Sequence, residues 1–163
     1  TNLVYENPDL AAKFIKQLSE VYRYVLDTRD RELVSKEEEL TFLKSYVFLQ
    51  KIRFGDSIQI SIQLEAVETY FPPLVLQMLI ENAIKHNIIT VDQPLTIHIY
   101  ADKDFVVVEN KLQKKKTQSE ASFGVGLNNI RLRYTFFTDR EVVVEELTDK
   151  FIVRIPVIER VSL

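Results

Sequence analysis

The chain has 163 residues, of which 46% are hydrophobic and 28% charged, and its formal net charge is −3. These values are typical of a folded protein with one main core, they exclude a disordered chain, and the slightly acidic balance gives no basis for a nucleic-acid partner. The absence of cysteine excludes disulfides and thiolate metal sites, and no apolar run approaches the roughly 20 residues that cross a bilayer.

Two amphipathic helices are predicted in the first third of the chain. The first begins after Asn7, which can cap it, and continues to about Asp27 with apolar residues at spacings of three and four. A capping-box pattern at Ser35 begins the second, which continues to about Arg53. Their short charged connection predicts an antiparallel helical hairpin over residues 1–55. The apolar stripe of the first helix fits an intramolecular contact and a dimer interface equally well.

The remaining residues, 56–163, mix strand and helix patterns. Alternating or short apolar runs predict five strands: 57–64, 95–101, 105–108, 141–147 and 151–158. The last four form two predicted hairpins. Together with the helices they predict an α+β fold, a two-layer α/β sandwich whose mixed, mostly antiparallel sheet is covered on one face by helices.

One predicted helix has an apolar face for burial and an opposite face with polar side chains that could bind a ligand. It begins at Pro72-Pro73, where missing amide donors are tolerated, and continues to His86 without a helix breaker. Apolar residues gather on one side, and the other side carries Met78, Glu81, Asn82 and Lys85. A carboxylate, a carboxamide and an ammonium within one turn can hold a hydrated cation and phosphates. A solvated face with a Glu81–Lys85 ion pair is the alternative.

A second candidate site follows the predicted strand 105–108. Residues 109–123 lack periodicity and predict a long mobile loop, in which Lys114–Lys116 can screen phosphates or remain solvated. Gly124 and Gly126 come directly before another predicted helix. Paired glycines that begin a helix are a candidate phosphate cradle, because the free amides and the helix dipole both favour an anion.

These two motifs resemble those of a known family. Glu81-Asn82-Ala83-Ile84-Lys85-His86 resembles the N box, and Gly124-Val125-Gly126-Leu127-Asn128-Asn129-Ile130-Arg131-Leu132 the glycine box, of the Bergerat-fold superfamily of gyrase-type ATPases and sensor histidine kinases. Further residues resemble the LytS-like branch of the kinases: Leu18-Ser19, Arg23-Tyr24-Val25-Leu26, Glu39-Leu40, Tyr46, Gln50, Arg53-Phe54, Pro72-Pro73-Leu74, Leu76-Gln77 and Ile155-Pro156-Val157.

The resemblance implies that residues 56–163 are an ATP-binding catalytic domain. ATP would be bound with Mg²⁺, and its γ-phosphoryl group would pass to a histidine and then to a response-regulator aspartate. The resemblance further implies a homodimer and a cytoplasmic domain of a protein that is anchored in the bacterial inner membrane through segments outside this sequence.

The resemblance also implies roles for individual residues. Asn82 would be the Mg²⁺ ligand, Lys85 would lie near the phosphates, and Glu81 would orient the nucleophile or a metal-bound water, which makes Glu81 and Lys85 the candidate catalytic residues. His86 would cap the helix end or touch phosphate, and residues 111–123 would form a lid. The full set of implied nucleotide contacts is Asn82, Lys85, His86, Asn110, Gly124, Gly126 and Leu127.

The sequence departs from the family pattern at three places. Met78 stands where gyrase-type ATPases carry a catalytic Glu, which favours transfer to a histidine over hydrolysis. Asn110 replaces the Asp that reads adenine, and a neutral hydrogen bond contributes about 1 kcal/mol against about 1.5 to 3 for a charged one. The phosphoacceptor histidine is expected just before Thr1. A degenerate nucleotide-binding or dimerisation module, a pseudokinase, is therefore the alternative function.

Overall fold

The computed structural model describes residues 3–116 and 124–159. In chain order its elements are α1 (Leu3–Glu6), α2 (Pro8–Asp27), β1 (Val34–Ser35), α3 (Lys36–Phe54), a 3-10 turn (Gly55–Ser57), β2 (Ile58–Gln63), β3 (Tyr70–Phe71), α4 (Val75–His86), β4 (Leu95–Asp102), β5 (Phe105–Lys111), α5 (Gly124–Tyr134), β6 (Val143–Glu146) and β7 (Lys150–Pro156). Within these described ranges, none of the helices is both long and apolar enough to span a bilayer.

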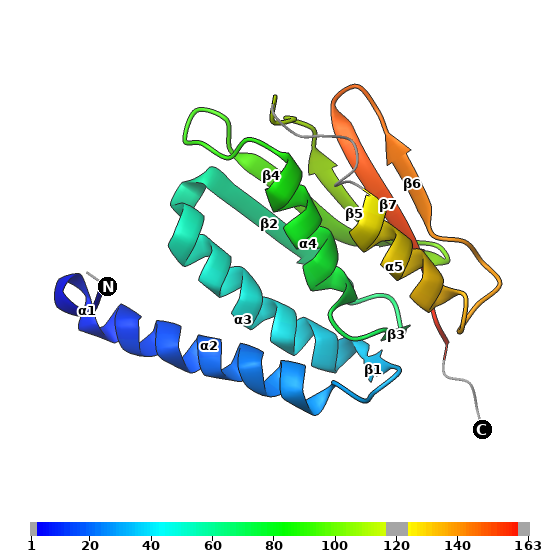
Figure 1. Cartoon of the computed structure of the whole chain (residues 1–163), viewed down its shortest axis with the longest axis horizontal. Helices are drawn as coiled ribbons and strands as arrows, with labels where there is room; N and C mark the ends of the chain where they lie inside the picture. Colours follow the sequence, from blue (N-terminus) through cyan, green and yellow to red (C-terminus); the bar gives the residue numbers. More distant parts are fainter. Residues whose placement is uncertain (1–2, 117–123, 160–163) are drawn as a thin grey trace.

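Five strands form one mixed sheet in the order β2-β4-β5-β7-β6. β2 pairs with β4 in parallel, and the other neighbours are antiparallel. Helices α3, α4 and α5 lie on one face of this sheet (Figure 1). The predicted two-layer sandwich and both predicted hairpins are confirmed. A second sheet, β1 with β3, was missed because two residues per strand are too few to show alternation.

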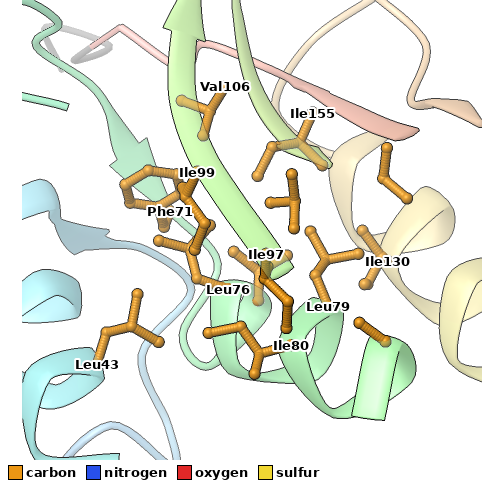
Figure 2. Packing of buried hydrophobic residues seen from close by; sticks show 14 of the residues in the cluster. Leu43, Phe71, Leu76, Leu79, Ile80, Ile97, Ile99, Val106, Ile130 and Ile155 are labelled. Carbon is orange, nitrogen blue, oxygen red and sulfur yellow. The ribbon is translucent and has the colours of Figure 1, made fainter. Parts of the chain in front are cut away.

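The core fills the space between the sheet and the helices. Its buried residues come from α3, α4 and α5 and from the facing sides of the strands, among them Leu43, Leu76, Leu79, Ile80, Ile97, Ile99, Val106, Ile130 and Ile155 (Figure 2). Each fully buried Leu or Ile contributes about 1.5 to 3 kcal/mol to stability. Because Leu43 belongs to α3, the core continues across the domain boundary that we predict at residue 55.

The start of α4 differs from the prediction. Pro72 and Pro73 lie before the helix, in the turn after β3, and α4 begins only at Val75. A residue that precedes a proline is disfavoured in the helical region, which keeps Pro72 out of the helix. Leu74 then adopts a left-handed conformation with φ 69°, and the N–H of Val75 donates to the Pro72 carbonyl at 3.3 Å.

The helical hairpin of α2 and α3 forms as predicted. α2 packs on α3 through one of its sides, where Tyr24 stacks on Phe42 with ring centroids 4.4 Å apart. Its other side leaves Ile15, Tyr22 and Leu26 60%, 64% and 70% exposed. α2 therefore has an intramolecular contact and also a free apolar stripe, and both interpretations of its pattern remain compatible with the fold.

The predicted capping box at the start of α3 is present. The Ser35 hydroxyl accepts from the Glu38 N–H at 3.2 Å, and the Glu38 carboxylate accepts from the Ser35 N–H at 2.9 Å. Arg31 also binds this carboxylate through two guanidinium nitrogens, at 2.6 and 3.0 Å. The Arg31 hydrogen bonds, followed by the Ser35 N–H, lower the pKa of Glu38 to about 2.

This lowered pKa predicts a pH-dependent contribution to stability. A carboxylate whose pKa is lowered in the folded state stabilises the protein above its ordinary value of 4.5, and this contribution is lost as the pH falls toward 2. Since the Glu38 side chain is 42% exposed, we expect Glu38→Gln to reduce the free energy of unfolding by about 0.5 to 1 kcal/mol at pH 7 and by less at pH 3. Urea titrations at both pH values measure the difference. Glu37→Gln is the control, and an equal loss at the two pH values would contradict the prediction.

Candidate functional site

The polar side of α4 borders two neighbouring helices. Met78 faces α5, because its Sδ lies 3.9 Å from Nη1 of Arg133, and Asn82 lies one turn further along the same stripe. Glu81 and Lys85 instead line a cleft that α4 forms with α3. These four residues follow the spacing i, i+3, i+4 and i+7, so they share the side of α4 opposite its buried residues, as predicted, and this side borders α5 at one edge and α3 at the other.

The cleft between α3 and α4 has a volume of about 590 Å³. It is lined by Tyr46, Gln50, Arg53, Phe54, Glu81, Ile84, Lys85, Asn87, Ile89 and Lys115. The Glu81 carboxylate accepts hydrogen bonds from the Gln77 amide, at 2.6 Å, and from the Tyr46 hydroxyl. Burial raises the pKa of Tyr46, and the Glu81 charge raises it further, so the hydroxyl keeps its proton and remains the donor.

Three cations of this cleft lie at helix C-termini. Arg53 is in the last turn of α3 and Lys85 in the last turn of α4. The ammonium of Lys115 donates to the Lys85 carbonyl at 2.9 Å. A helix dipole favours positive charge at its C-terminal end, so these positions have a structural reason that requires no bound anion.

On its other side, α4 faces the start of α5. The two helices lie side by side and run in opposite directions, so the C-terminal end of α4 lies beside the N-terminal end of α5 (Figure 1). The sequence-predicted residues Asn82, Gly124 and Gly126 therefore come from the two facing ends of neighbouring helices. Leu127 is buried, so its side chain packs in the core.

The two glycines lie in the first turn of α5 itself, and neither has a positive φ. A Cβ at Gly126 would meet no atom of the described residues within 4 Å, and one at Gly124 would meet only Asn128 Nδ2, at 3.7 Å. Packing within the described part of the chain thus gives no reason for glycine at these positions. The backbone here is open to the close approach of a ligand.

Asn110 lies near the end of β5 and is 3% exposed. It is on the same strand face as Val106 and Val108, the face that packs in the core beneath the helices. Its Nδ2 donates to the Lys111 carbonyl at 2.8 Å. A carboxylate cannot make this bond, so the amide has a local structural role that Asp could not fill.

The end of α4 is capped by Asn87, a residue that the sequence analysis missed. The Asn87 amide donates to the Ala83 carbonyl at 2.8 Å, and its Oδ1 accepts from the Gln113 N–H at 2.7 Å. His86, for which capping or phosphate contact was expected, is 2% exposed, and its ring lies inside the protein. An Asn that follows the last helical residue is itself a helix-end signal, so the sequence contained the information.

The first part of the predicted lid is anchored across this helix end. The Ile88 N–H donates to the Gln113 carbonyl at 2.8 Å, and the Lys115 N–H donates to the His86 carbonyl at 3.2 Å. The Gln113 side chain adds bonds to the carbonyls of Ile88, Gln93 and Pro94. The prediction of a mobile loop is therefore wrong for residues 109–116, and residues 117–123 lie outside the described residues.

Comparison with known proteins gives a consistent result. The family model for histidine kinases matches residues 1–58. The sensor protein kinase HptS of Staphylococcus aureus is 34% identical over 137 residues, which are 81% of this chain and 24% of HptS. The chain thus spans about a quarter of the length of this relative.

Two solved structures have a similar fold. The cytoplasmic segment of histidine kinase QseC has a TM-score of 0.53 and 14% identity, and the match covers 93% of this chain and 95% of that one. The Acinetobacter baumannii histidine kinase AdeS has a TM-score of 0.50 and 12% identity, and the match covers 88% of this chain and 76% of that one. At such low identity the likeness shows the fold alone.

The anchoring of residues 112–116 can be tested at Asn87. We expect Asn87→Ala to lower the free energy of unfolding by about 2 to 3 kcal/mol, because the part-buried Gln113 N–H and the buried Ala83 carbonyl lose their partner. Amide hydrogen exchange at Gln113 and Lys115 should accelerate. Asn129→Ala, at an exposed position of α5, is the control and should change stability by less than about 0.5 kcal/mol. Unchanged exchange at Gln113 would show that Asn87 is not the anchor.

Proposed function

The chain belongs to the sensor histidine kinase family, and from this premise we propose that it is the ATP-binding catalytic region of a two-component sensor kinase. It would bind ATP with Mg²⁺ and transfer the γ-phosphoryl group to a histidine, for relay to a response-regulator aspartate. The observation that carries the proposal is that α4, which carries Asn82, lies beside α5, whose first turn has an open backbone at Gly126.

The residues at this position suit a magnesium nucleotide. A carboxamide oxygen is a hard ligand, and Mg²⁺ keeps several waters, so Asn82 alone can supply the protein's contribution. The first turn of α5 offers backbone amides and the positive end of a dipole to phosphates, and the missing side chain at Gly126 leaves them accessible. The carboxamide oxygen of Asn110 would accept a hydrogen bond from the adenine amino group. When bound, the metal neutralises charge on the phosphates.

We propose that Glu81 and Lys85 act near the γ-phosphoryl group of the nucleotide, the group that is transferred. Both line the cleft on the α3 side of α4, which is the side of the helical hairpin. We propose that a histidine approaching from the hairpin is oriented by Glu81, whose carboxylate is fixed by Tyr46 and Gln77, and that Lys85 attracts the phosphoryl group. The domain then acts by positioning and by charge neutralisation.

One observation favours a second function. The buried Asn110 amide is bonded to the Lys111 carbonyl, and a neutral side chain reads adenine more weakly than a carboxylate. A nucleotide-binding or dimerisation module that does not transfer phosphate, a pseudokinase, is therefore the second candidate.

We further propose that the chain forms a homodimer and lies in the cytoplasm. Ile15, Tyr22 and Leu26 of α2 are spaced seven and four residues apart, so they form one exposed apolar stripe that a second copy can bury. The QseC structure is of a cytoplasmic segment. By analogy we place this chain in the cytoplasm, with membrane anchoring through segments outside this sequence and with a response regulator as partner.

The metal role of Asn82 predicts a specific loss of binding. A fluorescent ATP analogue should bind the wild-type protein more tightly with Mg²⁺ than with EDTA. Asn82→Ala should abolish this difference and raise the Kd in Mg²⁺ about tenfold or more, because the metal loses its protein ligand. Gln59→Ala, which removes an exposed carboxamide from β2, is the control.

The outcome also separates the two candidate functions. Binding that is absent, or that is indifferent to both the metal and Asn82, would favour the pseudokinase. If binding has the expected metal dependence, the protein extended to include the upstream histidine should incorporate phosphate from labelled ATP.

The apolar stripe of α2 predicts self-association. We expect Leu26→Glu to raise the dissociation constant of the dimer at least tenfold, since a buried charge would replace an apolar contact. Sedimentation velocity over a concentration series measures the shift. Thr41→Glu, at an exposed position of α3, is the control. A wild-type chain that stays monomeric at high concentration would contradict the prediction.

A further inference from the structure

Glu39 of α3 has 0% exposure and lies where helices α2, α3 and α4 meet. We propose that Glu39 is a positioning residue for the nucleotide site. Its carboxylate caps the start of α4 and so fixes the helix that carries Asn82, while Tyr24 of α2 holds the carboxylate in place. This inference rests on the proposed function, in which Asn82 is the metal ligand.

The first contact of Glu39 replaces a missing helix cap. Pro72 and Pro73 have no backbone N–H, and Leu74, at the N-cap position of α4, offers no polar side chain. The N–H of Leu74 donates to Glu39 Oε2 at 3.2 Å, and the N–H of Leu76 donates to Oε1 at 3.3 Å. A residue of α3 thus supplies both acceptors, and its charge lies at the positive end of the α4 dipole.

The second contact joins the carboxylate to α2. The Tyr24 hydroxyl donates to Glu39 Oε2 at 2.6 Å, while the Tyr24 ring stacks on Phe42. Burial raises the pKa of Tyr24, and the Glu39 charge raises it further, so the hydroxyl stays a donor. In Figure 1, α2, α3 and α4 lie in succession. A shift of α2 on α3 would therefore move the hydroxyl that holds the carboxylate.

The third contact is electrostatic and reaches α5. Burial raises the pKa of Glu39 above its ordinary value, and its hydrogen bonds and the charge of Arg133 offset only part of this rise. Arg133 also lies against Met78, on the face of α4 that carries Asn82. The surroundings of Glu39 thus include both helices that form the walls of the proposed nucleotide site.

The distance from the cap to the metal ligand is short for a helix. Asn82 follows Leu74 by eight residues, which is about 12 Å along the axis. α4 is packed against the sheet along its length, so a change in tilt at its first turn is passed to Asn82 as a displacement of the whole helix. Glu39 can therefore affect the metal site without touching it.

The experiment compares Glu39→Gln with Glu37→Gln, the same change at an exposed position two residues earlier. Gln keeps the shape but places an amide N–H₂ against the donors of α4 or Tyr24. We expect the Kd for a fluorescent ATP analogue to rise about tenfold in Mg²⁺ and to stay within about twofold in EDTA. Exchange of the backbone amides at the start of α4 should accelerate. Glu37→Gln should change neither quantity.

A second pair of variants covers the case in which Glu39→Gln fails to fold. Tyr24→Phe removes one hydroxyl and keeps the ring on Phe42, and Tyr22→Phe makes the same change at an exposed position of α2. We expect Tyr24→Phe to raise the Kd in Mg²⁺ about threefold, with faster exchange in α4, and Tyr22→Phe to change neither.

Two results would overturn the inference alone, given a wild-type protein with metal-dependent binding. One is equal α4 exchange in Tyr24→Phe and Tyr22→Phe. The other is a loss of affinity that is the same in Mg²⁺ and in EDTA, which a general loss of folded protein would produce. A wild-type protein that binds no nucleotide would instead overturn the proposed function.

Discussion

The carboxylate of Glu39 is the constraint on which the arrangement of the helices depends. A charge with no exposed surface costs several kcal/mol unless hydrogen bonds and opposite charge compensate it. Here two amides of α4, a hydroxyl of α2 and the nearby Arg133 provide that compensation. These partners belong to three other helices, so the buried charge links α3 to α2, to the start of α4 and to α5.

The position of α4 then divides its polar residues between two neighbours. Met78, one turn before Asn82, contacts Arg133 of α5, whereas Glu81 and Lys85 line the cleft with α3. In the proposed function, the nucleotide and the acceptor histidine would therefore meet at neighbouring edges of one side of α4. The short β1–β3 sheet supports this division, because it joins the start of α3 to the segment that leads into α4.

Much of the fold follows from local patterns in the sequence. Alternation in residues 57–64 and 95–101 and the capping box at Ser35 each determined an element correctly, because burial and capping act over a few residues. The start of α4 and the fixed course of residues 112–116 did not follow. Both depend on single side chains, Glu39 and Asn87, whose partners lie far along the chain. Pattern reasoning detects periodic burial, but it does not detect one long-range hydrogen bond.

At the candidate site, too, sequence patterns locate elements but do not identify their tertiary neighbours. Sequence spacing located Gly124 and Gly126 at the start of a helix, and the structure confirms that position. The helical wheel of α4 placed Glu81 and Asn82 on the same side of the helix, but only the tertiary fold shows that this side borders α3 at one edge and α5 at the other. The buried residues of α3 have a further consequence for how such proteins recombine. Because α3 contributes to the same core as the sheet, an exchange of modules between relatives that joins two chains at the end of α3 would disrupt this core.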